Sequence, residues 1–316
     1  MRRWRKAASR RLCYTLAGCH CLLLLFHVRL DARGENPMDA KAIANGTIAA
    51  LEQGHYTALD GSTIEIAALQ AACVTGTRCY TPSDLVLIRE QVLAQAWPEM
   101  HTTFAVVNET TLQGCARLAA NQDEQRIGVL NFASAKNPGG GFLRGARAQE
   151  ESLARSSGLY FSQQQCPEFY AFHRAQETCL YSDHMIYSPA CPVVRDDAGN
   201  WLPQPYMVDF ITSPAPNAGA ILRNEPDNRQ YIVPTLAERT SKLLALAAHR
   251  QCDALVLGAW GCGVFCNDPL AVAAAFFAHL QPQGSYGTCF RHVVFSVFDT
   301  SHAGETYAAF ARQFAG

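Results

Sequence analysis

The sequence predicts an α/β domain in which a central, largely parallel sheet is covered by helices on both faces. From about residue 102, short apolar runs of strand length alternate with longer runs of helical periodicity. This alternation is typical of parallel sheets that lie between two layers of helices. In addition, a glycine-rich loop directly follows each of two apolar runs, the position where such sheets bind their ligands.

Residues 38–97 are mainly helical in pattern, and we expect a helix over 38–52, a turn at Asp60 and Gly61, and a helix that enters through Ser83 and Asp84 and runs to Ala96. The elements expected further along are strands at 102–107, 127–131, 185–187, 207–211, 254–257 and 292–298, with helices at 109–119, 152–161, 234–250, 269–279 and 303–314. Residues 188–230 are rich in proline, glycine and asparagine, so we expect long ordered loops that wrap the ligand site.

The formal net charge of −1 over 316 residues is an average of two unlike parts. Residues 1–37 carry a net charge of +6, and residues 38–316 carry −7. An acidic body gives no whole-protein electrostatic reason to bind nucleic acid or anionic lipid. We therefore expect no sequence-specific nucleic-acid partner and no stable membrane association. Separately, we expect a monomer.

The basic and apolar N-terminal segment, residues 1–37, is open to three interpretations. It resembles a signal peptide or membrane anchor, but Thr15, His20 and His27 interrupt its apolar run and no small-residue cleavage pattern ends it. Translation that starts at Met38, where helix-forming sequence begins, is the second interpretation. The third is a disordered tail outside the native fold.

The cysteines indicate a reducing compartment. Ten of the thirteen lie beyond residue 37 at irregular spacings, in a chain whose size does not require disulfides. We therefore expect free thiols and a cytoplasmic location. Cys262 with Cys266 and Cys73 with Cys79 have no accompanying CxxC or HxxxH pair, so we expect no metal site. Cys179 near Asp183 and His184 lacks a recognisable nucleophile turn, and we expect structural roles for all three.

Two glycine-rich loops are candidates for binding a diphosphate. The first contains Gly139, Gly140 and Gly141, and the second runs over 258–265. Glycine permits the positive φ that an anion nest needs and removes the Cβ that would block close approach. Neither loop matches a P-loop or a dinucleotide fingerprint, and a simple tight turn remains the alternative for each.

Three polar residues, Gln149, Glu150 and Glu151, follow the first loop and precede the helix expected at 152–161. Acidic residues in a first helical turn commonly serve as caps that complement the helix dipole. The alternative is that they place carboxylates beside a ligand held by the glycines.

These segments resemble a known family. The triple glycine, seven intervening residues and Gln149-Glu150-Glu151 are similar to the signature of poly(ADP-ribose) glycohydrolases, and 131–134, 213–217 and 258–269 resemble its bacterial, microbial-type branch. The similarity covers about residue 40 to the C-terminus. It implies a three-layer α/β/α macrodomain with a central mixed, largely parallel sheet. In this scheme 1–37 is an extension, 38–100 a helical preface packed on the catalytic domain, and 101–316 the catalytic domain.

The resemblance also implies roles for individual residues. Glu151 matches the catalytic glutamate, and Glu150 matches its neighbour that helps hold the ribose hydroxyls. The implied substrate-binding residues are Asn131, Ala133, Gly139, Gly140, Gly141, Gln149, Gly261, Cys262, Gly263, Val264 and Phe265. No metal and no cofactor is implied. Ser134 stands where many macrodomains have asparagine, and Ile127 lies near their adenine-binding aspartate, so the adenine contacts stay unassigned.

The implied activity is hydrolysis of ribose–ribose O-glycosidic bonds in poly(ADP-ribose), mainly from chain ends, with release of ADP-ribose. The reaction passes through an oxocarbenium-like transition state with Glu151 as general acid and base. Adjacent helical residues diverge by about 100° and cannot flank one bond, so one glutamate does the chemistry. Poly(ADP-ribose) or ADP-ribosylated proteins are then the substrates. The alternatives are a non-catalytic ADP-ribose-binding macrodomain and a hydrolase of mono-ADP-ribosyl esters or O-acyl-ADP-ribose.

Overall fold

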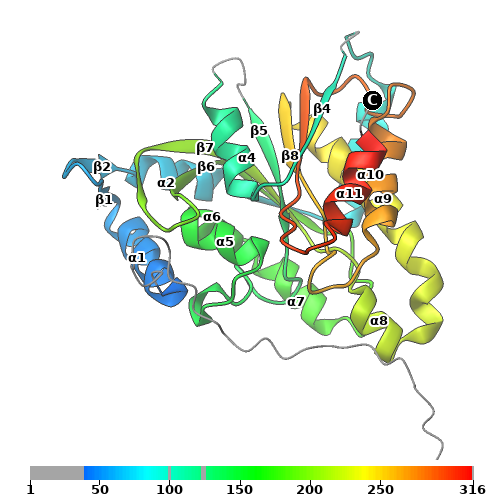
Figure 1. The fold of residues 1–316 in the computed structure, drawn as a ribbon, viewed down its shortest axis with the longest axis horizontal. Coiled ribbons are helices and arrows are strands. Elements are labelled where there is room, and N and C mark those ends of the chain that lie inside the picture. Colours follow the sequence, from blue (N-terminus) through cyan, green and yellow to red (C-terminus); the bar gives the residue numbers. More distant parts are fainter. Residues whose placement is uncertain (1–38, 99–100, 122–125, 315–316) are drawn as a thin grey trace, which may run out of the picture. The chain divides into compact units, whose positions relative to one another are not determined.

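The computed structural model describes residues 39–98, 101–121 and 126–314, so the expectations for residues 1–37 lie outside it. All the described residues belong to one compact unit. Its main sheet has the strand order β3-β6-β7-β5-β8-β9-β4 (Figure 1). The strands are β3 (Arg78–Tyr80), β4 (Thr103–Val107), β5 (Ile127–Phe132), β6 (Met185–Arg195), β7 (Trp201–Ser213), β8 (Ala254–Leu257) and β9 (His292–Ser296).

The sheet is mixed and largely parallel, as predicted. Every neighbouring pair from β7 through β5, β8 and β9 to β4 is parallel, and β6 runs antiparallel to both β3 and β7. The inner strands are continuous apolar runs because both of their faces are buried. The carboxyl ends of β5, β8 and β9 therefore meet at one edge of the sheet.

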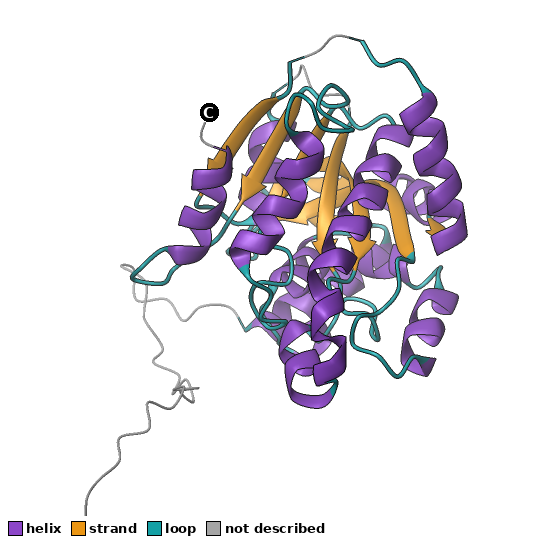
Figure 2. Ribbon diagram, turned by 90° about the vertical axis from the view of Figure 1, so that its right-hand side faces the viewer, coloured by secondary structure: helices purple, strands orange, loops and turns teal. Residues whose placement is uncertain are grey.

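Helices cover both faces of the sheet (Figure 2). One apolar core joins α3, α9, α10 and α11 to the sheet, and a second joins α2, α4 and α5 to its other face. These two cores confirm the predicted three layers. The helices are α1 (Ala40–Gln53), α2 (Ala67–Gly76), α3 (Pro82–Ala94), α4 (Thr111–Ala119), α5 (Gln149–Ser156), α6 (Leu159–Gln163), α7 (Pro167–Ala175), α8 (Ala218–Asn224), α9 (Ile232–His249), α10 (Pro269–Leu280) and α11 (Glu305–Phe314).

The N-terminal part of the described chain is helical, as expected, but it also contributes strands. A small hairpin, β1 (His55–Thr57) with β2 (Thr63–Glu65), encloses the predicted turn at Asp60 and Gly61. Strand β3 forms an edge of the main sheet, which the helical pattern did not predict. Helix α3 begins one residue earlier than Ser83, because Thr81 and Asp84 form a capping box ahead of Pro82.

The expectation of loops throughout 188–230 is wrong, since β6 and β7 form a long antiparallel pair there. Three of the four prolines in these strands, Pro189, Pro203 and Pro205, lie where the ladder is irregular, whereas Pro192 pairs with Met207. Pro189 lies within a register shift between Ser188 and Cys191, where Ala190 has a φ of 43°. The stretch 203–205 lies within a second irregularity, beyond the part of β7 that pairs with β5. Proline is tolerated in strands at such positions because no ladder hydrogen bond is lost.

The single helix expected at 152–161 is two helices. Helix α5 begins at Gln149, so the Gln-Glu-Glu segment forms its first turn, and α6 starts anew at Leu159. The break falls at Ser157 and Gly158, where Ser157 bridges to β6. A Cβ on Gly158 would lie 1.8 Å from the side-chain oxygen of Gln70, so a larger residue would displace Gln70, whose Nε2 donates to the carbonyl of Gly158.

Two further expectations can be compared with the described residues. All ten of their cysteines are free thiols. None of their helices is both long and apolar enough to cross a membrane.

We predict that α3 stabilises the whole unit through its contact with α9. Leu85 is fully buried in the shared core, and its replacement by alanine should lower the free energy of unfolding by about 2–5 kcal/mol. Leu87 on the same helix is 58% exposed, so Leu87→Ala should change it by less than about 0.5 kcal/mol. Urea denaturation measures both, and equal small effects would mean that α3 is not part of the cooperative core.

Candidate active site

A cavity of about 820 Å³ opens at the carboxyl ends of β5, β8 and β9. This is the predicted location for a ligand in a sheet of this class. The sequence-predicted residues that line it are Ala133, Gly140, Gly141, Gln149, Glu150, Glu151, Gly261, Cys262, Gly263, Val264 and Phe265. Asn131 and Gly139 lie outside this lining, and their contacts with the residues behind it are described below.

Glu150 is the most extensively held side chain of the site. Its carboxylate is 2% exposed and accepts three hydrogen bonds. Oε1 accepts from Nδ2 of Asn131 at 3.1 Å and from Nε2 of Gln163 at 2.9 Å, and Oε2 accepts from the backbone N–H of Ser134 at 2.6 Å. Burial raises the pKa of Glu150 to about 7, although the three donors oppose that shift. Glu150 therefore links β5, the loop after it and α6.

Glu151 is half-buried at the cavity wall, where its Oε1 accepts from the backbone N–H of Gly141 at 2.9 Å. Gly140 has a φ of 58°, and a Cβ there would lie 2.3 Å from Oε1 of Glu151 and 3.2 Å from Oε2 of Glu150. Glycine is required at 140 for both reasons. The two carboxylates approach the same point from one side, so they do not flank a bound glycosidic bond as a conventional pair would.

Gln149 attaches the glutamate helix to the sheet. Its Oε1 accepts from the backbone N–H of Phe132 at 2.9 Å, and its Nε2 donates to the carbonyl of Leu130 at 2.8 Å. Helix α5 has no side-chain cap at Ala148, so these bonds fix its first turn in place of a cap. Both ends of the Gln149 amide are thus used within the protein.

Gln163 is a site residue that the sequence reasoning missed. It is fully buried, its Oε1 accepts from the backbone N–H of Gly139 at 2.7 Å, and its Nε2 donates to Glu150. It therefore joins the first glycine loop to the buried carboxylate. The sequence offered no signal, because Gln163 is the first of three consecutive glutamines and nothing distinguishes it from its exposed neighbour Gln164.

The second glycine loop is shaped by contacts beneath it. Gly261 has a φ of 73°, and a Cβ there would lie 2.4 Å from Nδ2 of Asn267. The same Nδ2 donates to the carbonyl of Pro216 at 2.8 Å, which joins this loop to the segment after β7. Val264 at the tip is 79% exposed. Burial raises the pKa of Cys262 to about 12, so its thiol stays protonated and is no nucleophile at neutral pH.

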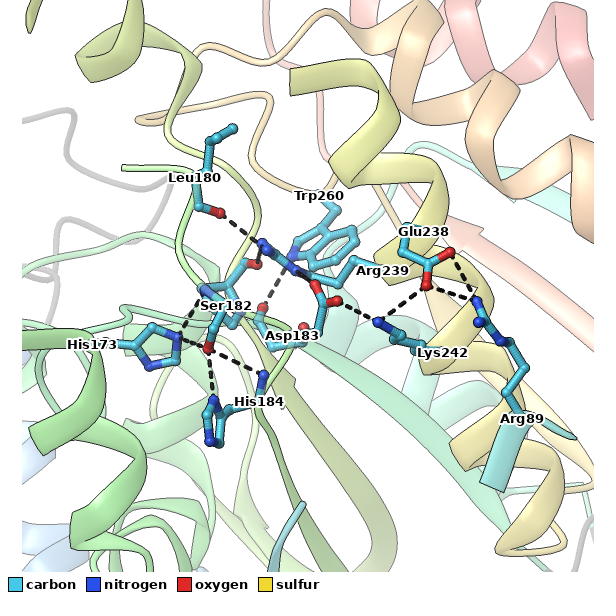
Figure 3. A network of polar contacts seen from close by, with 12 residues as sticks. Arg89, His173, Leu180, Ser182, Asp183, His184, Glu238, Arg239, Lys242 and Trp260 are labelled. Atoms are coloured by element: carbon cyan, nitrogen blue, oxygen red, sulfur yellow. Dashed lines mark hydrogen bonds and ion pairs between the residues drawn. The ribbon is translucent and has the colours of Figure 1, made fainter. Parts of the chain in front are cut away.

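One side of the cavity is aromatic and consists of Tyr181 and Phe265. A buried polar network centred on Arg239 holds the loop next to Tyr181 (Figure 3). Tyr181 lines the cavity, and its ring lies 6.1 Å from that of Phe265. Arg239 on α9 donates to the carbonyls of Leu180 at 3.0 Å and Pro214 at 2.7 Å, so it holds two loops at once. Its charge is balanced by Asp183, with Nε to Oδ1 at 2.8 Å.

The same network answers the question of a thiol nucleophile. Asp183 also pairs with Lys242 at 2.6 Å, and His184 shares a 2.8 Å hydrogen bond with Ser182 (Figure 3). Cys179 instead receives its carboxylate contact from Glu225, through the Cys179 backbone N–H. These contacts hold the three residues within the fold, which agrees with the structural roles expected from the sequence.

Three cations, Lys136, Arg144 and Arg147, are exposed at the cavity. Arg155 is different, since it is buried and donates to the carbonyl of Ala146 and, at 3.0 Å, to Oγ of Ser152. Arg155 therefore braces the loop, whereas the other three are available to an anionic ligand.

The raised pKa of Glu150 predicts a pH dependence of stability with an unusual sign. Between its ordinary pKa of 4.5 and about 7, the unfolded chain has lost this proton while the folded protein keeps it. Its contribution to stability is therefore complete below pH 4.5 and falls by about 3 kcal/mol as the pH rises to 7. Urea denaturation of wild type and Glu150→Gln at several pH values measures this as a changing difference between the two proteins.

Glu225 provides the control. Hydrogen bonds from Thr178, Asn228 and Cys179 outweigh its burial and lower its pKa to about 2. Its carboxylate is thus ionised in both states above about pH 5.5, and Glu225→Gln should show a constant difference from wild type between that pH and 7. A constant difference for Glu150→Gln as well would refute the raised pKa.

Comparisons with known proteins agree with this geometry. The family model for the microbial-type PARG catalytic domain matches residues 44–196. The crystal structure of poly(ADP-ribose) glycohydrolase from Thermomonospora curvata is similar with a TM-score of 0.83 and 49% identity, covering 87% of this chain and 99% of that one. Its complex with the inhibitor ADP-HPD is similar with a TM-score of 0.79 and 49% identity, and the match covers 87% of this chain and 99% of that one.

The Deinococcus radiodurans enzyme in complex with ADP-ribose has a TM-score of 0.74 and 44% identity, covering 80% of this chain and 98% of that one. No curated protein matches the sequence. The resemblance inferred from the triple glycine and Gln149-Glu150-Glu151 is confirmed. The match covers nearly the whole of both solved proteins, at 49% and 44% sequence identity. The chain belongs to the microbial-type poly(ADP-ribose) glycohydrolase family.

Proposed function

We propose that the protein hydrolyses ribose–ribose O-glycosidic bonds in poly(ADP-ribose), mainly from chain ends, and releases ADP-ribose. The observation that carries this proposal is the Glu151 carboxylate, which the Gly141 N–H holds at the wall of a cavity lined by two glycine loops. Simple ADP-ribose binding does not require an acid there. The solved relatives that hold ADP-ribose and ADP-HPD support a ligand of this type.

In the proposed mechanism Glu151 protonates the departing 2′-oxygen as the bond to the anomeric carbon breaks. The oxocarbenium-like state then takes up a water molecule, which loses its proton to the same carboxylate. Glu150 meanwhile helps to hold the ribose hydroxyls from its position beside Glu151. The second glycine loop supplies backbone N–H groups for the diphosphate, whose negative charge it accommodates without a metal or a cofactor. The N–H groups of Gly139, Gly140 and Gly141 already donate within the protein, so the first loop contributes close approach of its backbone instead.

The predicted substrate-binding residues divide into two groups in this proposal. Ala133 and residues of both glycine loops, Gly140, Gly141, Gly261, Cys262, Gly263, Val264 and Phe265, contact the substrate because they line the cavity. Asn131, Gly139 and Gln149 are positioning residues, since their hydrogen bonds lead to Glu150, Gln163 and the β5 backbone. Tyr181 joins Phe265 on the aromatic side.

Two features support attack at chain ends. A cavity of about 820 Å³ is of the size that holds one small-molecule unit. The body beyond residue 37 carries a net charge of −7, which disfavours long contacts with a polyanion. Lys136, Arg144 and Arg147 then provide local attraction at the cavity.

The remaining parts of the proposal concern the whole chain. We assign catalysis to residues 101–316 and treat 38–100 as a preface that supports them. The free cysteines support a cytoplasmic location. There the protein acts as a monomer on ADP-ribosylated proteins or on free polymer.

Replacement of the proposed acid separates catalysis from binding. Glu151→Gln should lower kcat on poly(ADP-ribose) at least a hundredfold, because the departing oxygen loses its proton donor. The Kd for ADP-ribose should change less than threefold, since Gln keeps the shape and the hydrogen bond to Gly141. Chromatography of released ADP-ribose and calorimetric titration measure the two quantities, with the exposed Glu90→Gln as control.

The other outcomes distinguish the alternatives. Tight ADP-ribose binding by wild type without polymer turnover would identify a non-catalytic macrodomain. Turnover of a mono-ADP-ribosylated protein or O-acyl-ADP-ribose, with none of the polymer, would identify another linkage. Full polymer turnover by Glu151→Gln would show that Glu151 is not the acid.

A further inference from the structure

Three side chains with metal-binding chemistry gather away from the cavity. They are Cys79 on β3, Cys166 at the N-terminus of α7 and Glu168 in the first turn of that helix. The two sulfur atoms and a carboxylate oxygen all lie within 4.8 Å of one another. We propose that these three residues bind a thiophilic divalent cation, with Zn²⁺ as the expected ion.

The distances suit zinc without refolding. Zn²⁺ binds thiolate sulfur at about 2.3 Å and carboxylate oxygen at about 2.0–2.2 Å in tetrahedral geometry. Neighbouring ligand atoms in such a site are therefore about 3.5–3.8 Å apart. Contraction by about 1.3 Å or less converts the present arrangement into a ligand set, and side-chain rotation of the exposed Glu168 can supply much of it.

The surroundings provide both an enclosed side and an open side. Cys166 is 2% exposed and belongs to an apolar cluster with Phe169, Tyr170 and Ile186, against which Cys79 packs. Glu168 faces solvent, so water can enter as the fourth ligand. Binding releases the two thiol protons to solvent, and the two thiolates and one carboxylate then compensate the charge of the cation.

A second observation comes from Tyr170 in the same cluster. This residue is 1% exposed, and its hydroxyl has no hydrogen-bond partner in the described part of the chain. A buried hydroxyl without a partner costs free energy, and a thiolate is a stronger hydrogen-bond acceptor than a neutral thiol. Negative charge at Cys166 or Cys79 favours the protonated hydroxyl of Tyr170, so metal-bound thiolates are compatible with this buried group.

The site would tie two separate parts of the chain together. The first part is strand β3 of the N-terminal preface, which carries Cys79. The second is the segment between α6 and α7, where the backbone N–H of Cys166 donates to the carbonyl of Gln163 at 3.1 Å. A cation there would brace the segment behind Glu150 without touching the cavity. Its role is structural, so this inference does not depend on the proposed hydrolase activity.

Cobalt substitution provides the test. We expect reduced, tag-free, full-length protein to bind one equivalent of Co²⁺, with a thiolate-to-cobalt charge-transfer band that Zn²⁺ removes by competition. Cys79→Ser and Cys166→Ser should abolish the band, and Glu168→Gln should weaken affinity at least tenfold while the band remains. Cys289→Ser, which removes a buried thiol elsewhere, should bind cobalt as wild type does.

Thermal melting covers the case in which a cysteine variant does not fold. Zn²⁺ should raise the Tm of wild type in a concentration-dependent way, and exposed Glu168→Gln should reduce that rise. The proposal is wrong if wild type shows no band, if the band survives loss of both Cys79 and Cys166, or if Glu168→Gln leaves cobalt affinity and the Tm rise unchanged.

Discussion

The active site depends on the burial of one carboxylate, that of Glu150. A buried carboxylate is costly unless donors compensate it, and here Asn131, Ser134 and Gln163 all donate to its two oxygens. These donors come from β5, from the loop after β5 and from α6. One side chain accepts all three hydrogen bonds. It therefore fixes the positions of the sheet, the first glycine loop and α6 relative to one another.

Docking of Glu150 determines where Glu151 lies. Helix α5 has no side-chain cap, so Gln149 and Glu150 hold its first turn against β5. The next residue along a helix lies about 100° further round, which directs Glu151 toward the cavity and the Gly141 N–H. Gly140 has a positive φ and faces both carboxylates, so a Cβ there would crowd Glu151 and Glu150 and glycine is required. The position of Glu151 in the cavity is therefore a consequence of the hydrogen bonds that Asn131, Ser134 and Gln163 donate to the buried Glu150.

The sequence predicted the parts of this structure that depend on local pattern. The inner strands β5, β8 and β9 are continuous apolar runs, and the glycines and Gln149-Glu150-Glu151 form a local motif. The β6–β7 pair was missed because proline argues against a strand, and only the pairing reveals that Pro189, Pro203 and Pro205 lie at irregularities of the ladder. Gln163 and the Cys79–Cys166–Glu168 group were missed for a related reason, since their meaning comes from contacts between distant segments.

A double-mutant cycle tests most directly whether the hydrogen bonds to buried Glu150 serve to position Glu151. Gln163→Ala removes one donor to Glu150 and the acceptor for Gly139, so it should lower kcat on poly(ADP-ribose) at least tenfold, while exposed Gln164→Ala should not. In a Glu151→Gln background the same Gln163→Ala change should lower the residual kcat less than twofold, because the group it positions is gone. An equal loss in both backgrounds would contradict the account.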